Sequence, residues 1–208
     1  MPNSNPPPPN ILSYDDLREA AAAFSRRHWP QGTIPVDIEH MVDVGLGVDI
    51  VPVDGLYQAV DVGGFLSSDG SAIFVDRAAY EHVKLYHYRF TLAHEIAHRE
   101  LHGHLLAEAV YETPQDWYAF QDTIPEEDRR WYEWQANSFA GLVLVPPDAL
   151  SSKVGEAVGL LRGSGVADPD LGEEATRSYL AEWVGRRFEV SADVILRRGK
   201  YDGHWSEF

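Results

Sequence analysis

The sequence predicts an α+β fold, in which a small, mostly antiparallel β-sheet packs among helices. Residues 57–76 contain two β-rich runs separated by Gly, Ser and Asp, which is typical of a hairpin. From about residue 80 onward the pattern of apolar residues is mainly helical. We therefore expect the strands in the first part of the chain and helices in the rest.

The N-terminal third predicts a lead, a helix and a helix–strand unit. Residues 1–10 are rich in proline and asparagine and predict a disordered lead. Ser13 is a candidate N-cap for a helix that continues to about Arg27. Residues 34–53 predict a short helix that a glycine ends before a strand begins. Within the hairpin, residues 72–76 are the stronger strand, because they combine β-branched and aromatic side chains.

The rest of the chain predicts helices separated by prolines and glycines. The histidine-rich segment 89–104 has a helical pattern. Residues 126–144 predict a second helix, which Pro146 must end. A glycine-rich loop then leads to two helical stretches, at about 173–186 and 191–198.

The composition limits the chemistry of any site. The 208 residues are 44% hydrophobic, as in a globular protein, and include no cysteine, so thiolate metal sites and cysteine nucleophiles are excluded. No apolar run approaches the roughly 18 residues of a membrane helix, and the N-terminus lacks the regions of a signal peptide. We expect a cytoplasmic protein without membrane contact, in which histidines and carboxylates hold any metal.

The net charge of −16 is unevenly distributed. Residues 151–208 carry eight Lys/Arg and ten Asp/Glu, a balance of −2, which leaves −14 for residues 1–150. Such a field repels nucleic acid and attracts basic partners. Ser191 begins a short helix that ends in Arg197 and Arg198, but two arginines can contact only a few phosphate groups. We therefore expect no direct nucleic-acid binding.

The segment from Arg89 to His104 contains four histidines and two glutamates in sixteen residues. Residues i and i+4 of a helix lie on one face, so His94 and His98 can direct two imidazoles at one ion. Glu95 lies beside them, where its carboxylate can take a proton from water. The motif His94-Glu95-x-x-His98 therefore predicts two ligands and a general base, and leaves the third ligand to be found.

Neither nearby histidine suits the role of third ligand. His102 lies eight residues from His94, roughly 12 Å along a straight helix, which is too far for one ion. His104 has the metzincin spacing, but that motif requires glycine where this chain has Leu101, and a methionine turn downstream. We expect His102 to pack or to support a ligand.

A carboxylate on another helix is the remaining choice. Glu133 lies beside an apolar stripe whose small alanines allow close helix packing, and Asn137 follows it by one turn, where it could orient a histidine. This position favours Glu133 over Glu126 and Glu127, although most glutamates on such an acidic helix are surface residues. Spacing alone leaves the choice open.

Two segments in sequence order resemble the ImmA/IrrE family of metallopeptidases. They are RFTLAHEIAHRELH, residues 89–102, and EWQANSFAGLVLVP, residues 133–146. The likeness extends over about residues 34–198 and includes the ending LAEWVGRRFEVSADVILRR. One departure, LVLVP in place of the usual Leu-Leu-Met-Pro, affects no ligand position.

The resemblance implies a zinc-dependent endopeptidase in which His94, His98 and Glu133 hold Zn²⁺ and Glu95 is the catalytic base. It also implies a helix-turn-helix transcriptional repressor or antitoxin as substrate, in a phage, mobile-element, stress-response or toxin–antitoxin setting. A non-cleaving toxin or regulatory module that sequesters such a regulator is the alternative. On this basis residues 11–150 are the metallopeptidase domain, and residues 151–208 are a helical extension packed on it or appended to it.

Two further expectations concern the substrate. An extended peptide commonly binds by pairing with a free sheet edge. We expect such an edge at Ala72, Ile73, Phe74 and Val75, the alternative being an interior strand with both neighbours in place. Candidate donors to a developing oxyanion are Tyr86, His87, Arg89 and Tyr132.

Overall fold

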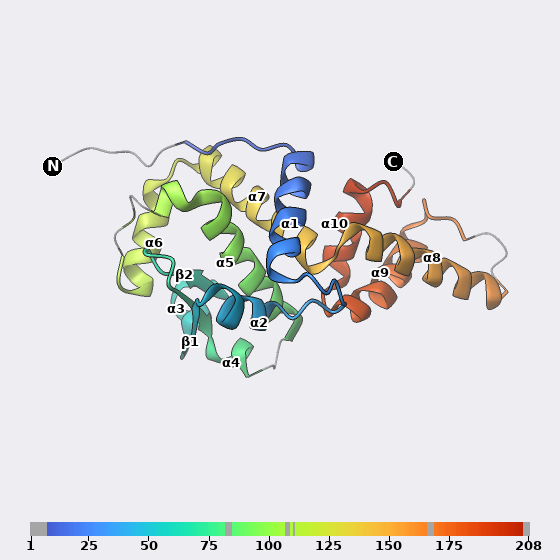
Figure 1. Ribbon diagram of the computed structural model, residues 1–208, viewed down its shortest axis with the longest axis horizontal. Coiled ribbons are helices and arrows are strands. Elements are labelled where there is room, and N and C mark those ends of the chain that lie inside the picture. The colour runs from blue at the N-terminus through green and yellow to red at the C-terminus, as the bar shows by residue number, and fades with distance from the viewer. Residues whose placement is uncertain (1–7, 82–84, 107–108, 110, 166–168, 206–208) are drawn as a thin grey trace.

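The computed structural model of the protein describes residues 8–81, 85–106, 109, 111–165 and 169–205. Residues 1–7 of the predicted lead lie outside this set, as does part of the predicted loop at 163–172. The fold is α+β, as the sequence predicts, with a three-stranded sheet among helices. Figure 1 shows α5 (Leu85–Leu106) above the sheet and α7 (Glu126–Leu144) beside α5. At the other end of the molecule lie α8 (Pro147–Gly163), α9 (Glu174–Phe188) and α10 (Ala192–Tyr201).

The elements follow the chain in an order that places all strands before residue 77. They are α1 (Tyr14–His28), α2 (Ile38–His40), the π-helical turn η1 (Met41–Gly45), β1 (Asp49–Val53), α3 (Leu56–Val60), β2 (Gly64–Leu66), β3 (Ala72–Asp76), α4 (Arg77–Tyr80), α5 (Leu85–Leu106), α6 (Pro114–Thr123), α7 (Glu126–Leu144), α8 (Pro147–Gly163), α9 (Glu174–Phe188) and α10 (Ala192–Tyr201).

The sheet has the order β1-β3-β2, and its two pairings differ in direction. β2 pairs with β3 antiparallel, as the predicted hairpin requires. β1 pairs with β3 in parallel, so the sheet is mixed and the prediction of a mostly antiparallel sheet was wrong in this respect. The physical reason is that residues 54–71, with α3 and β2, are long enough for the crossover that a parallel pair needs.

This topology also corrects the predicted substrate edge. Ala72, Ile73, Phe74 and Val75 belong to β3, which is the central strand and has its backbone paired on both sides. The amino-acid composition of a segment can predict a strand, but it does not predict which other strands will pair with it. Within the described residues, the outer strands of the sheet are β1 and β2.

Helix ends follow local rules in most places. Ser13 caps α1 in a capping box with Asp16, as its position before the helix predicts. Four helices were not predicted: α3, which occupies the start of the predicted hairpin, α4, α6 and α8. α6 and α8 begin with proline in the first turn, at Pro114 and Pro147, where the missing N–H has no cost. A proline pair that ends α7 therefore also begins α8.

α5 and α7 pack against each other through small side chains. Ala93 and Ala97 on α5, and Ala136 and Ala140 on α7, are each at most 2% exposed. Because alanines have little bulk beyond Cβ, the two helix backbones can approach closely. This contact sets the distance between the functional side chains of the two helices.

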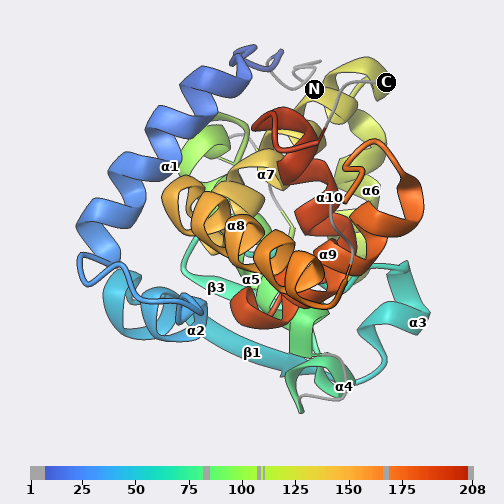
Figure 2. The same cartoon turned by 90° about the vertical axis from the view of Figure 1, so that its right-hand side faces the viewer.

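The C-terminal helices share the same hydrophobic core as the sheet and α5. One continuous cluster of buried residues extends from Leu17 to Trp205. The buried Arg89 of α5 adds polar links, because it donates to the carbonyls of Val36 at 2.6 Å and Glu189 at 3.3 Å. Figure 2 shows α8, α9 and α10 together over one end of α7.

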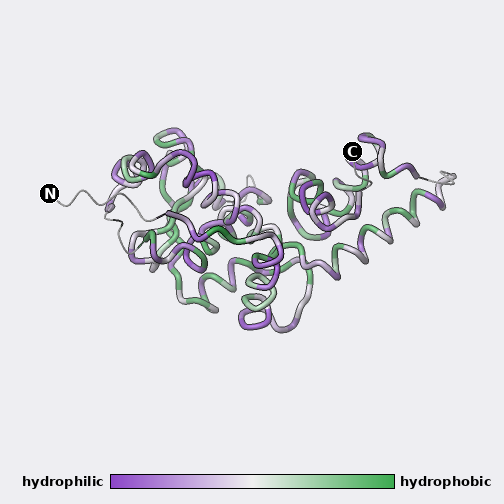
Figure 3. The backbone as a smooth tube through the Cα atoms, turned by 90° about the horizontal axis from the view of Figure 1, so that it is seen from above, coloured by the Kyte–Doolittle hydropathy of each residue, from purple (hydrophilic) through white to green (hydrophobic). Residues whose placement is uncertain are grey.

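The helices have mixed surfaces. In Figure 3 hydrophobic and hydrophilic stretches alternate along them, which is typical of helices with one buried face. Among the helices that the structure describes, none combines the length and apolar character needed to cross a bilayer.

Candidate metal centre

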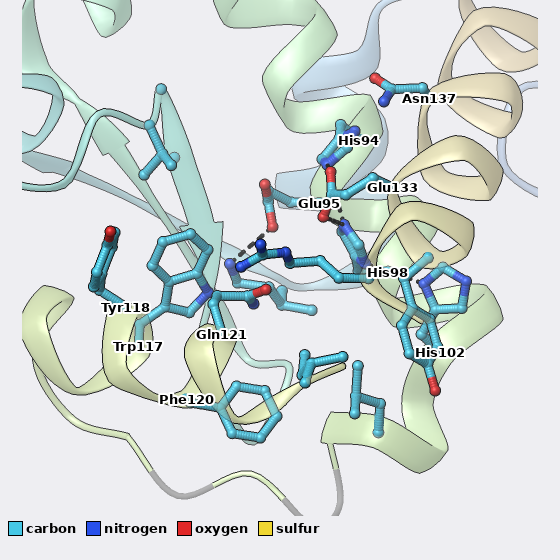
Figure 4. Close-up of a pocket in the computed structure, with 18 of the residues that line it drawn as sticks. His94, Glu95, His98, His102, Trp117, Tyr118, Phe120, Gln121, Glu133 and Asn137 are labelled. Atoms are coloured by element: carbon cyan, nitrogen blue, oxygen red, sulfur yellow. Dashed lines mark hydrogen bonds and ion pairs between the residues drawn. The ribbon is translucent and has the colours of Figure 1, made fainter. Parts of the chain in front are cut away.

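Three side chains from two helices converge in the cleft between α5 and α7. The Nε2 atoms of His94 and His98 lie 3.0 Å apart. Glu133 reaches them from α7, with one carboxylate oxygen 3.2 Å from His94 Nε2 and the other 3.5 Å from His98 Nε2. Figure 4 shows the three side chains pointing toward one another.

The donor atoms of this cluster suit a zinc ion. In a tetrahedral site with ligand bonds of about 2.0–2.1 Å, two ligand atoms lie about 3.3 Å apart. The three measured separations of 3.0, 3.2 and 3.5 Å bracket that value. Two imidazoles and a carboxylate also leave a coordination position open, as catalytic zinc sites do. Within the described residues, His94, His98 and Glu133 are the group whose geometry would hold a metal.

The electrostatics of the cluster favour a charged carboxylate. Burial by itself would raise the pKa of Glu133, but hydrogen bonds and charge from His94 and His98 outweigh it and hold that pKa far below its usual range. Burial likewise opposes a charge on His94, yet the hydrogen bond with Glu133 raises its pKa. A metal ion would replace the protons that the histidines share with Glu133.

Asn137 contacts the cluster from α7, one turn after Glu133. A side-chain hydrogen bond with Asn137 contributes to the raised pKa of His94. Figure 4 shows Asn137 beyond His94, on the side away from His98. The sequence-based expectation that Asn137 orients a histidine stays a prediction, and this contact identifies His94 as that histidine.

Glu95 lies next to the cluster but faces the sheet. Its Oε2 accepts a hydrogen bond from the backbone N–H of Leu66 in β2 at 3.0 Å. The carboxylate is 8% exposed, and burial raises its pKa. A carboxylate with a raised pKa, held at the wall of a cleft, is suited to accept a proton and release it again.

A pair of glycines allows α5 to approach β2 this closely. A Cβ added to Gly64 would lie 2.7 Å from the Phe74 carbonyl oxygen and 2.7 Å from Thr91 Cγ2. A Cβ on Gly63 would meet His87 Nε2 at 2.4 Å. Larger residues here would push β2 away from α5 and separate Glu95 from the Leu66 N–H.

His102 is outside the metal cluster and supports it instead. α5 kinks at His102, where φ is −120° and ψ is 22°. The Nδ1 of His102 lies 3.0 Å from His98 Nδ1. When His98 keeps the lone pair of Nε2 for an ion, its Nδ1 carries the proton and donates to His102. His102 therefore fixes the tautomer and ring orientation of His98.

The surroundings of His102 keep it neutral. Its side chain is 1% exposed, and burial lowers its pKa to about 3, against an opposing contribution from Gln135. Tyr132 packs edge-on against the ring, with the centroids 4.7 Å apart. A neutral His102 can accept the proton of His98 at physiological pH, which a charged one cannot.

His104 does not join the ligand atoms. Its Nε2 lies 3.4 Å from the hydroxyl of Tyr132, on the far side of the kink. The arrangement thus agrees with the argument against metzincin geometry, in which this histidine would be the third ligand.

The cluster opens into a cleft of about 860 Å³ between α5, α6, α7 and β2. The sequence did not predict the wall opposite α5, where Tyr111, Trp117 and Phe120 line the cleft. Tyr111 also donates from its hydroxyl to the Leu66 carbonyl at 2.7 Å. The aromatic residues between 111 and 120 could have indicated a binding wall. Because this segment shows no clear helix pattern, the sequence did not show where in the fold they lie.

The four candidate oxyanion donors differ in whether they line the cleft of the metal cluster. Arg89 is excluded, because its guanidinium is directed to backbone carbonyls and to Glu189. Tyr132 and His87 line the cleft of the metal cluster. Tyr86 lines an adjoining cavity.

The comparisons with known proteins agree with the motifs. A family model described as Peptidase_M78, IrrE N-terminal-like domain, matches residues 80–159. This stretch includes both α5 and α7, and so every residue of the cluster. No match was found among curated proteins. The match confirms the resemblance read from the two motifs: residues 80–159 are similar to the IrrE N-terminal-like domain of the Peptidase_M78 metallopeptidases.

Proposed function

We propose that this protein is a zinc-dependent endopeptidase that cleaves a helix-turn-helix transcriptional regulator, either a repressor or an antitoxin. The observation that carries the proposal is the convergence of His94, His98 and Glu133 beside a buried Glu95 in an open cleft. The regulator as substrate is supported by the family resemblance.

The residues of the chain divide the reaction between them. A zinc ion held by His94, His98 and Glu133 would act as a Lewis acid and would lower the pKa of water from 15.7 to about 7. Glu95, oriented by the Leu66 N–H, takes a proton from the attacking water and later gives it to the leaving amine. The walls formed by β2 and α6 restrict the substrate to an extended segment that passes Glu95.

Replacement of Glu95 separates cleavage from binding. Because Glu95 is not a ligand, we expect Glu95→Gln to keep one zinc per chain and to lose about 10²- to 10⁴-fold in peptide hydrolysis. The measurement uses a library of quenched fluorescent peptides, and separately a purified helix-turn-helix regulator as candidate substrate, with and without chelator.

If the protein acts by sequestering the regulator, the Glu95→Gln variant should remain active in cells. If the Glu95→Gln variant relieves repression as well as the wild type does, and the regulator stays intact, the protein acts by binding. If cleavage is lost together with the cellular effect, the peptidase proposal stands.

A further inference from the structure

A second cavity, of about 660 Å³, continues the cleft beyond the metal cluster. Four residues line both cavities: His87 and Phe90 of α5, and Trp134 and Asn137 of α7. Because Asn137 also contacts His94, the second cavity begins directly beside the cluster. A peptide that passes the cluster can therefore extend into it.

Residues of α10 and several aromatic side chains line this second cavity. Tyr14 and Tyr201 stack with their ring centroids 4.6 Å apart. The indole N–H of Trp134 donates to the Tyr201 hydroxyl at 3.2 Å. These contacts join α1, α7 and α10, so the shape of the cavity is fixed by side chains from three helices.

α10 presents two cations to the cavity. Arg197 and Lys200 line it, are exposed, and make no ion pair or hydrogen bond with the described residues. Of the described lining residues, Asp193 alone is acidic, and it makes no ion pair with Arg197 one turn later. Arg198 also lines the cavity, but it is buried and its charge is balanced by Asp202 at 2.6 Å.

The arginines that line the first cavity, at the metal cluster, are paired with acidic residues. Arg129 and Arg130 line it, and each has an acidic neighbour, at Asp122 and Glu126 respectively. In a chain of net charge −16, two unpaired cations in a concave surface are a local exception. Positive groups without an acidic partner of their own are available to a ligand.

The position of these cations argues against nucleic acid as that ligand. A helix that enters the major groove must project from its domain. The cationic face of α10 instead lines a hollow that Tyr14, Tyr86 and Trp134 also line, and the hollow continues to the metal cluster. An occupant of this site must be narrow enough to lie in the cleft.

We propose that this second cavity binds an acidic side chain of the peptide substrate, on one side of the scissile bond, and that Arg197 and Lys200 select it. The inference rests on the proposed peptidase function and adds a specificity to it. The overall negative field still attracts a regulator that is basic as a whole, whereas Arg197 and Lys200 act at short range on one acidic position.

The test uses zinc-loaded protein and a neutral quenched peptide in which Glu replaces Gln at one position at a time. We expect one position, or two alternate positions, at which Glu raises kcat/KM by about threefold to tenfold, in the range of a partly exposed ion pair. In the double variant Arg197→Glu, Lys200→Glu, Lys at that position should be preferred over Glu. Raising the salt concentration should reduce both preferences.

Arg186→Glu is the matched control. It reverses one charge, as Arg197→Glu does, on an exposed arginine of α9 that lines neither cavity, so the Glu/Gln ratio should stay at the wild-type value. An equal Glu/Gln ratio in the wild type and the Arg197/Lys200 double variant overturns the inference and leaves the peptidase function intact.

A binding measurement distinguishes failure of the inference from failure of the function. The same peptides, labelled for fluorescence anisotropy, are titrated with the zinc-loaded Glu95→Gln form. If no peptide is cleaved by the wild type but Glu peptides bind in a manner that depends on Arg197 and Lys200, the function fails and the inference holds. If peptides are neither cleaved nor bound, both are wrong.

Discussion

Helices α5 and α10 line the same continuous cleft, but they hold their polar side chains in opposite ways. On α5, Glu95 and His102 are buried, and each has a hydrogen-bond partner in the protein. On α10, Arg197 and Lys200 are exposed and have no ionic partner among the described residues. Groups that perform chemistry need a fixed geometry before substrate arrives, whereas groups that select a substrate must be free to pair with it.

The largest expected effect is on the metal. Glu133→Ala removes one of the three proposed ligands, and we expect the variant to lose stoichiometric zinc, as measured by elemental analysis after dialysis. His104→Ala is the matched control, because His104 faces Tyr132 and not the cluster. If the His104 variant loses zinc and the Glu133 variant keeps it, the third ligand is His104, as in metzincins.

A smaller effect on the metal should come from His102. His102→Leu removes the acceptor for His98 Nδ1, and we expect zinc affinity to fall about 10- to 100-fold while one zinc still binds at saturation. His102→Asn keeps an acceptor oxygen near the position of Nδ1 and should restore most of the affinity. Competition with a chromophoric chelator measures both. Equal affinities for the Leu and Asn variants would reduce His102 to a packing residue.

The same buried imidazole should make the metal-free protein sensitive to acid. The pKa of His102 is lowered from 6.5 to about 3 in the folded state, so between these values the unfolded chain binds more protons. The free energy of unfolding therefore falls as the pH is lowered from about 6.5 toward 3, and this group can contribute up to about 3 kcal/mol by pH 4. Urea unfolding in chelator should show a smaller loss for His102→Asn. A pH dependence that is unchanged in this variant would contradict the assignment.

The smallest effect concerns the position of α10. A Cβ on Gly199 would lie 2.1 Å from the Trp205 indole, so Gly199→Ala must displace that ring, at about 1–3 kcal/mol of stability. Gly155→Ala, on α8 with nothing within 4 Å of the added Cβ, should be neutral or stabilise by up to about 1 kcal/mol. Zinc content should stay at the wild-type level in both variants. Loss of zinc in Gly199→Ala would show that α10 and the metal cluster are not independent.

The sequence by itself determined the parts of this protein that depend on local spacing. His94 and His98 share a helix face because they are four residues apart, and Ser13 caps α1 because its side chain reaches the N–H of Asp16. The α+β class followed in the same way from the periods of the strands and helices. Glu133 was identified through the family resemblance, since spacing left Glu126 and Glu127 open.

Only the tertiary structure decided the relations between distant segments. It made β3 the central strand, because β1 and β2 both pair with it, although nothing within residues 72–75 shows that. It brought Glu133 within 3.5 Å of both histidines through the packing of α5 on α7, and turned His102 toward His98 at a kink. It also placed Arg197 and Lys200 in a hollow that continues to the metal cluster. Hydrogen-bond pairing and helix packing join residues that lie far apart in the chain, so no local pattern carries that information.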